Sequence, residues 1–374
     1  MNNRKLLVLS IVAAVSVLLA IIQTHISKPG PVTSSAGASL IQGLEPAAIG
    51  SIVIGTDENA VKLVRKGKVF VVGNKEDYPA ETSRVNKLIM ACFDVQTLEL
   101  ITGDPKNHEQ LEVTPQKAKS IVKFLDKDGK LITGIIIGKT DSQTRVTYAR
   151  LVSSSDVYSV TKTPTVKTSA MDYIDKEITN IETGDVVRVT LTGPEGSFTI
   201  RTDANDTVVI DEMPEGKKLR TTDAKNVLGA LSNLSFSDVK KESSFGKDEL
   251  KFDNVFVCEL KNSTVYTFNI ATVKDKTYVR CSAEYTADMT NIIQEKEKLK
   301  TKETKLLARD AALDFTDKHK GWVYEIPHYK VENLTKKLSE LLEEPKKEEK
   351  AESPKADEAK TPAVHDTNET PNIQ

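Results

Sequence analysis

Hydrophobic positions divide the chain into one long apolar run and a body in which apolar and polar residues alternate. The run, Leu6–Gln23, holds 18 residues without a charged side chain. A helix of that length rises ~27 Å, which is close to the hydrocarbon thickness of a bilayer. Arg4 and Lys5 precede the run, a bias that favours a cytoplasmic N-terminus and an exported body. The pattern predicts a transmembrane anchor within residues 1–28, followed by a linker over 29–47.

Two other interpretations of this run stay open. A cleaved signal peptide needs a small-residue cleavage site, and the A-x-A candidate at residues 36–38 lies well beyond the apolar core. A buried globular helix would suit a shorter apolar segment. No cysteine lies near the run, so a lipid-modified protein is not expected.

The body repeats one alternating pattern. In both copies the apolar residues alternate with polar ones, as half-buried antiparallel strands require. Turn-forming residues fall at the same point of each copy, at 57–59 and 193–196. The matched apolar positions, at one constant offset, are Ile52, Ile54, Val61, Leu63 and Val71 in the first copy and Val189, Leu191, Phe198, Ile200 and Val208 in the second.

Each copy continues with helical periodicity and then with further strands. Thr82-Ser83 and Thr221-Thr222 supply hydroxyls that suit a helix N-cap. Apolar residues then recur at i, i+3 and i+4, which predicts one buried helix face in each copy. Further strands are predicted at 120–125 and 131–137 in the first copy and at 254–260 and 265–271 in the second.

Together these patterns predict an α+β fold. After the transmembrane helix come two tandem repeats, at 48–182 and 183–342, and each is an antiparallel sheet with a helix packed on one face. Residues 343–374 contain almost nothing to bury, so they are expected to form a disordered tail.

The second repeat also carries a charged insert at 283–320. Its spacing predicts a helix with a narrow apolar seam, which either docks a partner helix or lies across its own domain. The residues that recur every seven positions along it are Ile292, Leu299, Leu306 and Leu313.

Charge and cysteine content narrow the possible partners and crosslinks. The net charge is −2, so no general attraction to nucleic acid is expected. Three cysteines leave at least one unpaired in an exported protein. Cys258 and Cys281 either pair or sit two strands apart in one sheet, which is too far for a disulfide. Alternatively, all three cysteines are small core residues.

Recognisable catalytic motifs are missing from the sequence, so the protein is not expected to be an enzyme or to need a cofactor. The run Gly134–Thr140 is one residue short of a phosphate-binding loop. His319 and His328 flank one predicted strand, where they either approach each other at a zinc ion or remain surface imidazoles. We expect no metal site.

Two arginines are the candidate binding residues. Arg150 and Arg280 occupy equivalent positions, two residues after Tyr148 and Tyr278. If the repeats are related by pseudo-symmetry, these side chains line a shared groove and bind an anion. Alternatively, they are ordinary strand-face arginines paired with local acids.

The Y-x-R segments and the run Gly321–Pro327, which reads GWVYEIP before a short C-terminal helix, resemble the bacterial family called domain of unknown function 4340. The likeness covers about residues 40–342. The resemblance implies a single-span protein of the inner membrane, with its N-terminus inside and its body in the periplasm or outside. It also implies association with ABC transporters of the gliding-motility type. It carries over no catalytic or binding residue.

We therefore expect a non-enzymatic, membrane-anchored accessory of an ABC-type transport complex. Its exported body would contact the permease or related envelope subunits. The alternative is an extracytoplasmic module that holds a lipid or glycan between the two repeats.

Overall fold

The structure is a computed structural model that describes residues 37–56, 59–287 and 298–344. Within those ranges, no helix combines the length and the hydropathy that crossing a bilayer requires. The predicted anchor at 1–28, the first part of the turn at 57–59, the middle of the insert and the tail from residue 345 lie outside the described residues.

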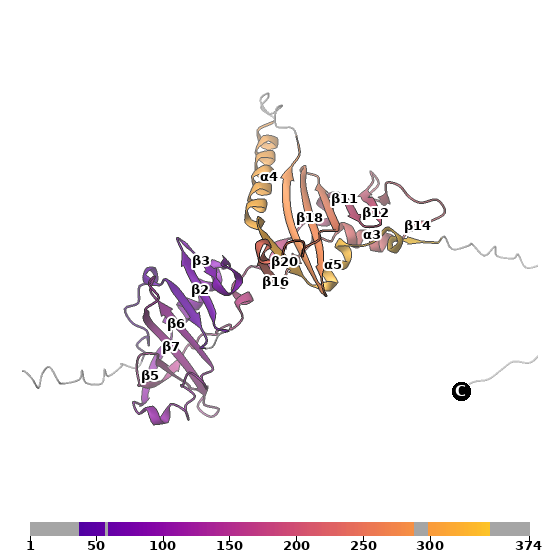
Figure 1. The fold of residues 1–374 in the computed structure, drawn as a ribbon. Helices are drawn as coiled ribbons and strands as arrows, with labels where there is room; N and C mark the ends of the chain where they lie inside the picture. Colours follow the sequence, from indigo (N-terminus) through magenta and orange to yellow (C-terminus); the bar gives the residue numbers. More distant parts are fainter. Residues whose placement is uncertain (1–36, 57–58, 288–297, 345–374) are drawn as a thin grey trace, which may run out of the picture.

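The described chain is mostly β-structure, so the predicted α+β class is wrong. Two large antiparallel sheets, of nine and eight strands, dominate two units that lie end to end (Figure 1). The described part has four α-helices, which are α2 (Thr82–Phe93), α3 (Thr221–Leu228), α4 (Lys298–His319) and α5 (His328–Leu334). The prediction failed because each sheet gains edge strands, several of them too short to show a periodic pattern.

The first unit is built on the nine-stranded sheet. Its centre follows the predicted alternation, with Ile52 opposite both Leu63 and Phe124 in the interior. In spatial order the strands are β4 (Tyr78–Pro79), β3 (Val69–Val72), β2 (Val61–Lys66), β1 (Ser51–Ile54), β6 (Ser120–Leu125), β7 (Leu131–Thr140), β8 (Thr147–Leu151), β9 (Val157–Thr161) and β5 (Gln96–Thr102).

The second unit arranges its strands in the same order. Read from edge to edge, its eight strands occupy the places of β3, β2, β1, β6, β7, β8, β9 and β5 in the first sheet, and only β4 has no counterpart in the eight-stranded sheet. In spatial order they are β13 (Val208–Ile210), β12 (Gly196–Thr202), β11 (Val186–Gly193), β17 (Asn254–Leu260), β18 (Thr264–Val273), β19 (Lys276–Tyr285), β20 (Trp322–Ile326) and β16 (Asp238–Lys241). Two further pairs are small sheets, β10 (Glu177–Thr179) with β15 (Leu234–Ser235) and β14 (Lys218–Leu219) with β21 (Leu342–Glu343).

The helices α2 and α3 lie at the predicted positions, but their N-cap residues differ from the predicted ones. Both bury the predicted apolar face, for example through Val85 and Val227. The N-cap residues are Glu81 and Arg220, and neither side chain caps its helix. The predicted threonine hydroxyls are not caps because Thr82 and Thr221 already lie inside the first turn.

The long helix α4 packs against β19 and β18 of its own sheet. Ala308 and Ala312 are buried on this contact, and the ring of Phe315 meets that of Tyr266 at 5.0 Å. The predicted seven-residue seam is wrong, because Leu313 is exposed. Small alanines let the helix approach the strands closely, so the buried face follows them rather than the leucines.

All three cysteines are free thiols in the interior. Cys258 lies in β17 and Cys281 in β19, with β18 between them. The expectation that they sit two strands apart is confirmed, and a disulfide between them is ruled out. Burial raises the pKa of the Cys92 and Cys258 thiols to about 12.

Candidate functional site

Arg150, the first predicted binding residue, is a buried structural residue of the first unit. Its Nε donates to the carbonyl of Val113 at 2.9 Å, and Nη1 donates to the carbonyls of Leu151 and Ser154 at 3.1 and 3.0 Å. Burial lowers the pKa of this guanidinium. These contacts tie the loop after β8 to the segment before β6.

Arg280 has a different environment in the second unit. Its Nη1 lies 2.8 Å from Oε1 of Glu242, and its guanidinium lies 4.5 Å from the ring centroid of Phe252. Both paired side chains are partly exposed, as expected for a strand-face arginine beside a local acid.

The two predicted tyrosines, Tyr148 and Tyr278, lie in different units, each in the same unit as its arginine. Tyr148 packs against a small apolar cluster of the first unit that includes Ile136 and Val157. Tyr278 is buried and meets the ring of Phe245 at 5.0 Å. The structure therefore places the four candidate residues in two sites, one in each unit, and does not bring the arginines together.

A cluster of rings joins the two units. Tyr78 of the first unit meets Trp322 at 4.9 Å, Phe236 at 6.0 Å and Tyr324 at 6.3 Å, always edge to face. Tyr78, Phe236, Trp322 and Tyr324, together with His319, form what we call the aromatic junction. Figure 1 shows the end of the first unit that carries β2 and β3 facing β16 and β20 of the second unit.

Polar contacts flank the aromatic junction. Lys75 Nζ lies 2.6 Å from Asp238 Oδ1, and both side chains are mostly buried. Glu76 Oε2 accepts hydrogen bonds from the backbone N–H of Lys241 at 2.7 Å and from Ser244 Oγ at 2.8 Å. Because charge-assisted hydrogen bonds are the stronger kind, these contacts fix the second unit against the first.

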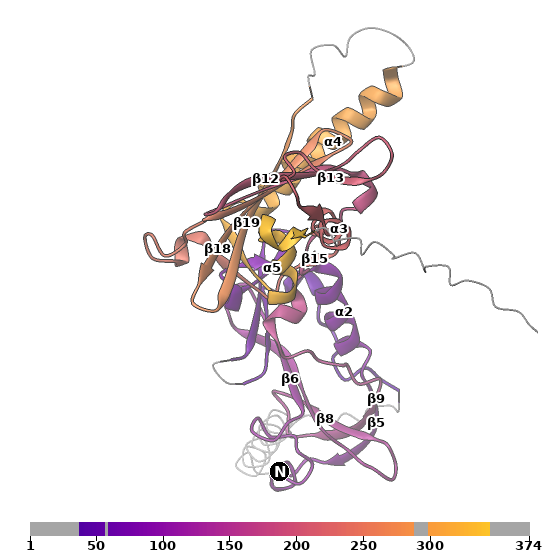
Figure 2. The same ribbon diagram turned by 90° about the vertical axis from the view of Figure 1, so that its right-hand side faces the viewer.

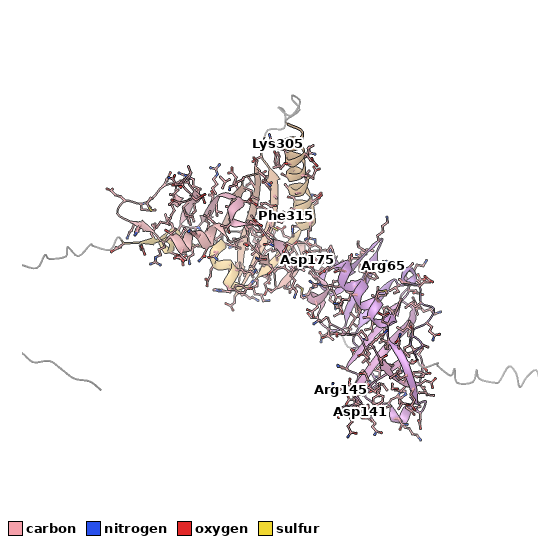
Figure 3. The ribbon with its side chains drawn as sticks, turned by 180° about the vertical axis from the view of Figure 1, so that it is seen from behind. Arg65, Asp141, Arg145, Asp175, Lys305 and Phe315 are labelled. Carbon is pink, nitrogen blue, oxygen red and sulfur yellow. The ribbon has the colours of Figure 1, made fainter. Side chains whose placement is uncertain are left out.

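His319 is fully buried in the aromatic junction and is its imidazole. Its Nδ1 lies 2.6 Å from the hydroxyl of Tyr324, and its Nε2 has no hydrogen-bond partner within the described ranges. Burial, helped by Lys318, lowers the pKa of His319 to about 4. The carboxylate of Asp175 acts in the opposite direction and raises this pKa. Asp175 lies in the segment that connects the two units and is labelled in Figure 3. The imidazole is therefore neutral at pH 7.

The structure separates the two histidines considered for zinc. His319 is buried, whereas His328 is exposed and lies 3.7 Å from Glu332 on its own helix. Among the described residues, no three histidine, cysteine or acidic side chains lie close enough together to hold a metal ion.

A groove of about 490 Å³ lies within the second unit rather than between the units. The β11–β12 turn forms one wall, and α5 with the short 3-10 helix η7 (Leu338–Leu341) forms the other. Lys337 reaches across to Glu195, while Lys336 is half-buried and makes no ion pair with any described residue. The apolar lining consists of Leu191, Pro194, Phe198, Val331, Leu334 and Leu338.

Sequence reasoning missed the aromatic junction and this groove. One signal was available, because Trp322, Tyr324 and Ile326 alternate and so share one face of a strand. Nothing in the local pattern indicated that Tyr78, far away in the chain, meets that face.

Comparisons with known proteins give one match. No curated protein and no solved structure matches the chain. A family model described as Domain of unknown function (DUF4340) matches residues 71–255, from β3 to the start of β17. The matched segment holds most of the first unit and the residues that tie it to β16. The expected resemblance to the DUF4340 family is thus confirmed over residues 71–255, which hold the first Y-x-R segment but not the GWVYEIP run.

Proposed function

We propose that this protein is a non-enzymatic accessory of an ABC-type transport complex. In this proposal the apolar sequence Leu6–Gln23 holds it at the inner membrane, and the body lies in the periplasm or outside. The body contacts the permease or related envelope subunits. The family resemblance supports the transporter association, and the hydropathy of the N-terminal sequence supports the membrane attachment.

The observation that carries the proposal is the aromatic junction with its flanking polar contacts. Two sheets of the same strand order are held as a fixed pair through Tyr78, Glu76 and Lys75. A fixed pair presents a surface larger than either unit, and such a surface suits a protein partner.

Affinity capture of the full-length protein from detergent extracts tests this function. We expect an ATP-binding cassette permease to be recovered together with the protein. A variant that carries both Lys75→Met and Glu76→Asn should recover less permease, because its two units are held less rigidly. A matched control is Lys66→Met, which removes an exposed ion pair with Asp77 inside the first unit. Repeated recovery of the protein alone would contradict the proposal.

A second candidate function is binding of a small amphipathic molecule such as a lipid. The groove favours it, because an apolar lining lies beside Lys336, which makes no ion pair with a described residue. Native mass spectrometry of the protein after mild extraction should reveal a bound molecule, and Val331→Trp, which fills the groove, should abolish it. If neither protein carries mass beyond that of its own sequence, this function is ruled out.

A further inference from the structure

Three large apolar side chains stand exposed on the outermost strand of the first unit. Leu98, Leu100 and Ile101 of β5 are 41%, 42% and 40% exposed. We call these three residues the β5 patch. The strand β5 pairs with β9 on one side, and on the other side the start of β5 bridges to residues 37–40, so the stretch from Leu98 onward forms the edge of the nine-stranded sheet.

The described chain begins at this same edge. The N–H of Gly37 donates to the carbonyl of Thr97 at 2.7 Å, and the N–H of Thr97 donates to the carbonyl of Ala38 at 2.9 Å. The apolar sequence that ends at Gln23 lies 14 residues earlier. An extended chain of that length spans at most about 48 Å. If the apolar sequence lies in a bilayer, the β5 edge is therefore tethered close to it.

The geometry of β5 disfavours pairing with another strand. Two β-bulges interrupt its register, one between Thr97 and Glu99 and one between Leu100 and Thr102. Bulges leave residues out of the hydrogen-bonding ladder and bend an edge away from a neighbouring strand. The extra residues are Leu98 and Ile101 themselves. A second copy of this chain could not extend the sheet here in continuous register.

Contact with a lipid surface needs no continuous hydrogen-bond register, since burial of apolar side chains is not directional. The same end of the sheet also carries basic residues suited to lipid headgroups. Arg145 lies in the turn between β7 and β8, and Lys162 directly follows β9. Both are exposed, and neither forms an ion pair with a described residue. Asp141 in that turn accepts three hydrogen bonds from Gln143 and Thr144.

The arrangement of the units agrees with this orientation. Figure 2 shows β5, β8 and β9 at the end of the first unit that points away from the second unit. Figure 3 labels Asp141 and Arg145 at that same end.

We propose that the β5 patch rests on the surface of a lipid bilayer, with Leu98, Leu100 and Ile101 inserted at the boundary between headgroups and acyl chains. This inference rests on the proposed membrane attachment. In this arrangement the first unit lies against the membrane, and the second unit, with α4 and the groove, lies away from the membrane.

Cysteine labelling can test the contact, because the three native thiols are buried and would not react. The full-length protein is reconstituted into vesicles made from equal amounts of phosphatidylcholine and phosphatidylglycerol. One variant carries Leu100→Cys, a second carries Ile101→Cys, and the control carries Leu307→Cys on α4, where the side chain is 63% exposed. Each is labelled with a fluorophore, and circular dichroism checks that the sheets are retained.

Spin-labelled lipids then report which position meets the bilayer. Interfacial segments bury their apolar side chains ~5–10 Å into the headgroup boundary, so we expect the lipids to quench roughly half of the emission at residues 100 and 101. The emission at residue 307 should not change. Equal quenching at all three positions, or none at any, overturns the inference.

Flotation of the same vesicles separates the two proposals. Protein that does not float with the vesicles overturns the membrane attachment and the β5 contact together. Protein that floats but shows no quenching at residues 100 and 101 overturns the β5 contact alone.

Discussion

The Nδ1 atom of His319 lies 2.6 Å from the hydroxyl of Tyr324, and this contact joins the last turn of α4 to the strand that meets the first unit. Burial raises the pKa of Tyr324, so its hydroxyl keeps its proton. Tyr324 in turn meets Tyr78 edge to face. The end of the long helix is thereby connected to the contact between the two units.

Stability should fall as the pH is lowered from about 6.5 to about 4. The folded-state pKa of His319 is about 4, below its unfolded value of 6.5, so the unfolded chain takes up the proton first. The loss from this residue is about 3 kcal/mol and is complete below pH 4. Urea unfolding at a series of pH values measures it. A His319→Gln variant should lose this part of the pH dependence, and an unchanged profile would show that another group is responsible.

Removing the Tyr324 hydroxyl should destabilise the protein. Tyr324→Phe keeps the ring but leaves both nitrogens of the buried His319 without a hydrogen-bond partner among the described residues, at a cost of about 1–3 kcal/mol. Thermal unfolding measures the change. Tyr329→Phe is the matched control, because Tyr329 is exposed and its loss of a hydroxyl should have no effect. Equal melting temperatures for both variants would contradict the assignment.

The two candidate arginines should differ sharply in their effect on stability. Arg150→Met leaves buried carbonyls without donors, and we expect a loss of about 2–4 kcal/mol. Arg280→Met removes a partly exposed ion pair and should cost about 1 kcal/mol or less. Denaturant unfolding of both variants provides the test. Similar small losses of unfolding free energy in both variants would reopen the possibility that both side chains bind an anion.

Loosening the polar contacts beside the aromatic junction should let the units move. Lys75→Met removes the pair with Asp238. Glu76→Asn replaces the carboxylate that accepts from the N–H of Lys241 with a shorter, uncharged amide, and asparagine tolerates the positive φ of 54° at this position. Spin labels at Leu100→Cys and Leu307→Cys, one in each unit, should then give a broader distance distribution. The control Lys66→Met should leave the distribution narrow. A narrow distribution in the double variant would show that the rings alone fix the units.

Periodic segments of the sequence predicted the central strands and both short helices well. The ranges 120–125 and 254–260 coincide with β6 and β17, since alternation is clear when one strand face is buried. The fold class failed because β4 and β14 have two residues each and carry no period. The predicted apolar seam of α4 was wrong because it followed the spacing of the leucines, whereas the buried face of the helix is formed by Ala308 and Ala312.

The candidate site was harder to predict than the strands. Arg150 and Arg280 occupy equivalent sequence positions, yet local loops give each its own partners. The aromatic junction and the groove depend on pairs far apart in the chain, such as Tyr78 with Trp322 and Glu195 with Lys337. A single sequence holds no local signal for such pairs.

The interior position of Cys92, Cys258 and Cys281 has a consequence for how the protein matures. Since none of the three contributes a crosslink, the folded state gains nothing from enzymes that oxidise thiols. Their high pKa leaves almost no thiolate to react with disulfide reagents at neutral pH. Once folded, the chain therefore keeps the same native state on either side of a membrane, because that state contains no disulfide to be reduced and no accessible thiol to be oxidised.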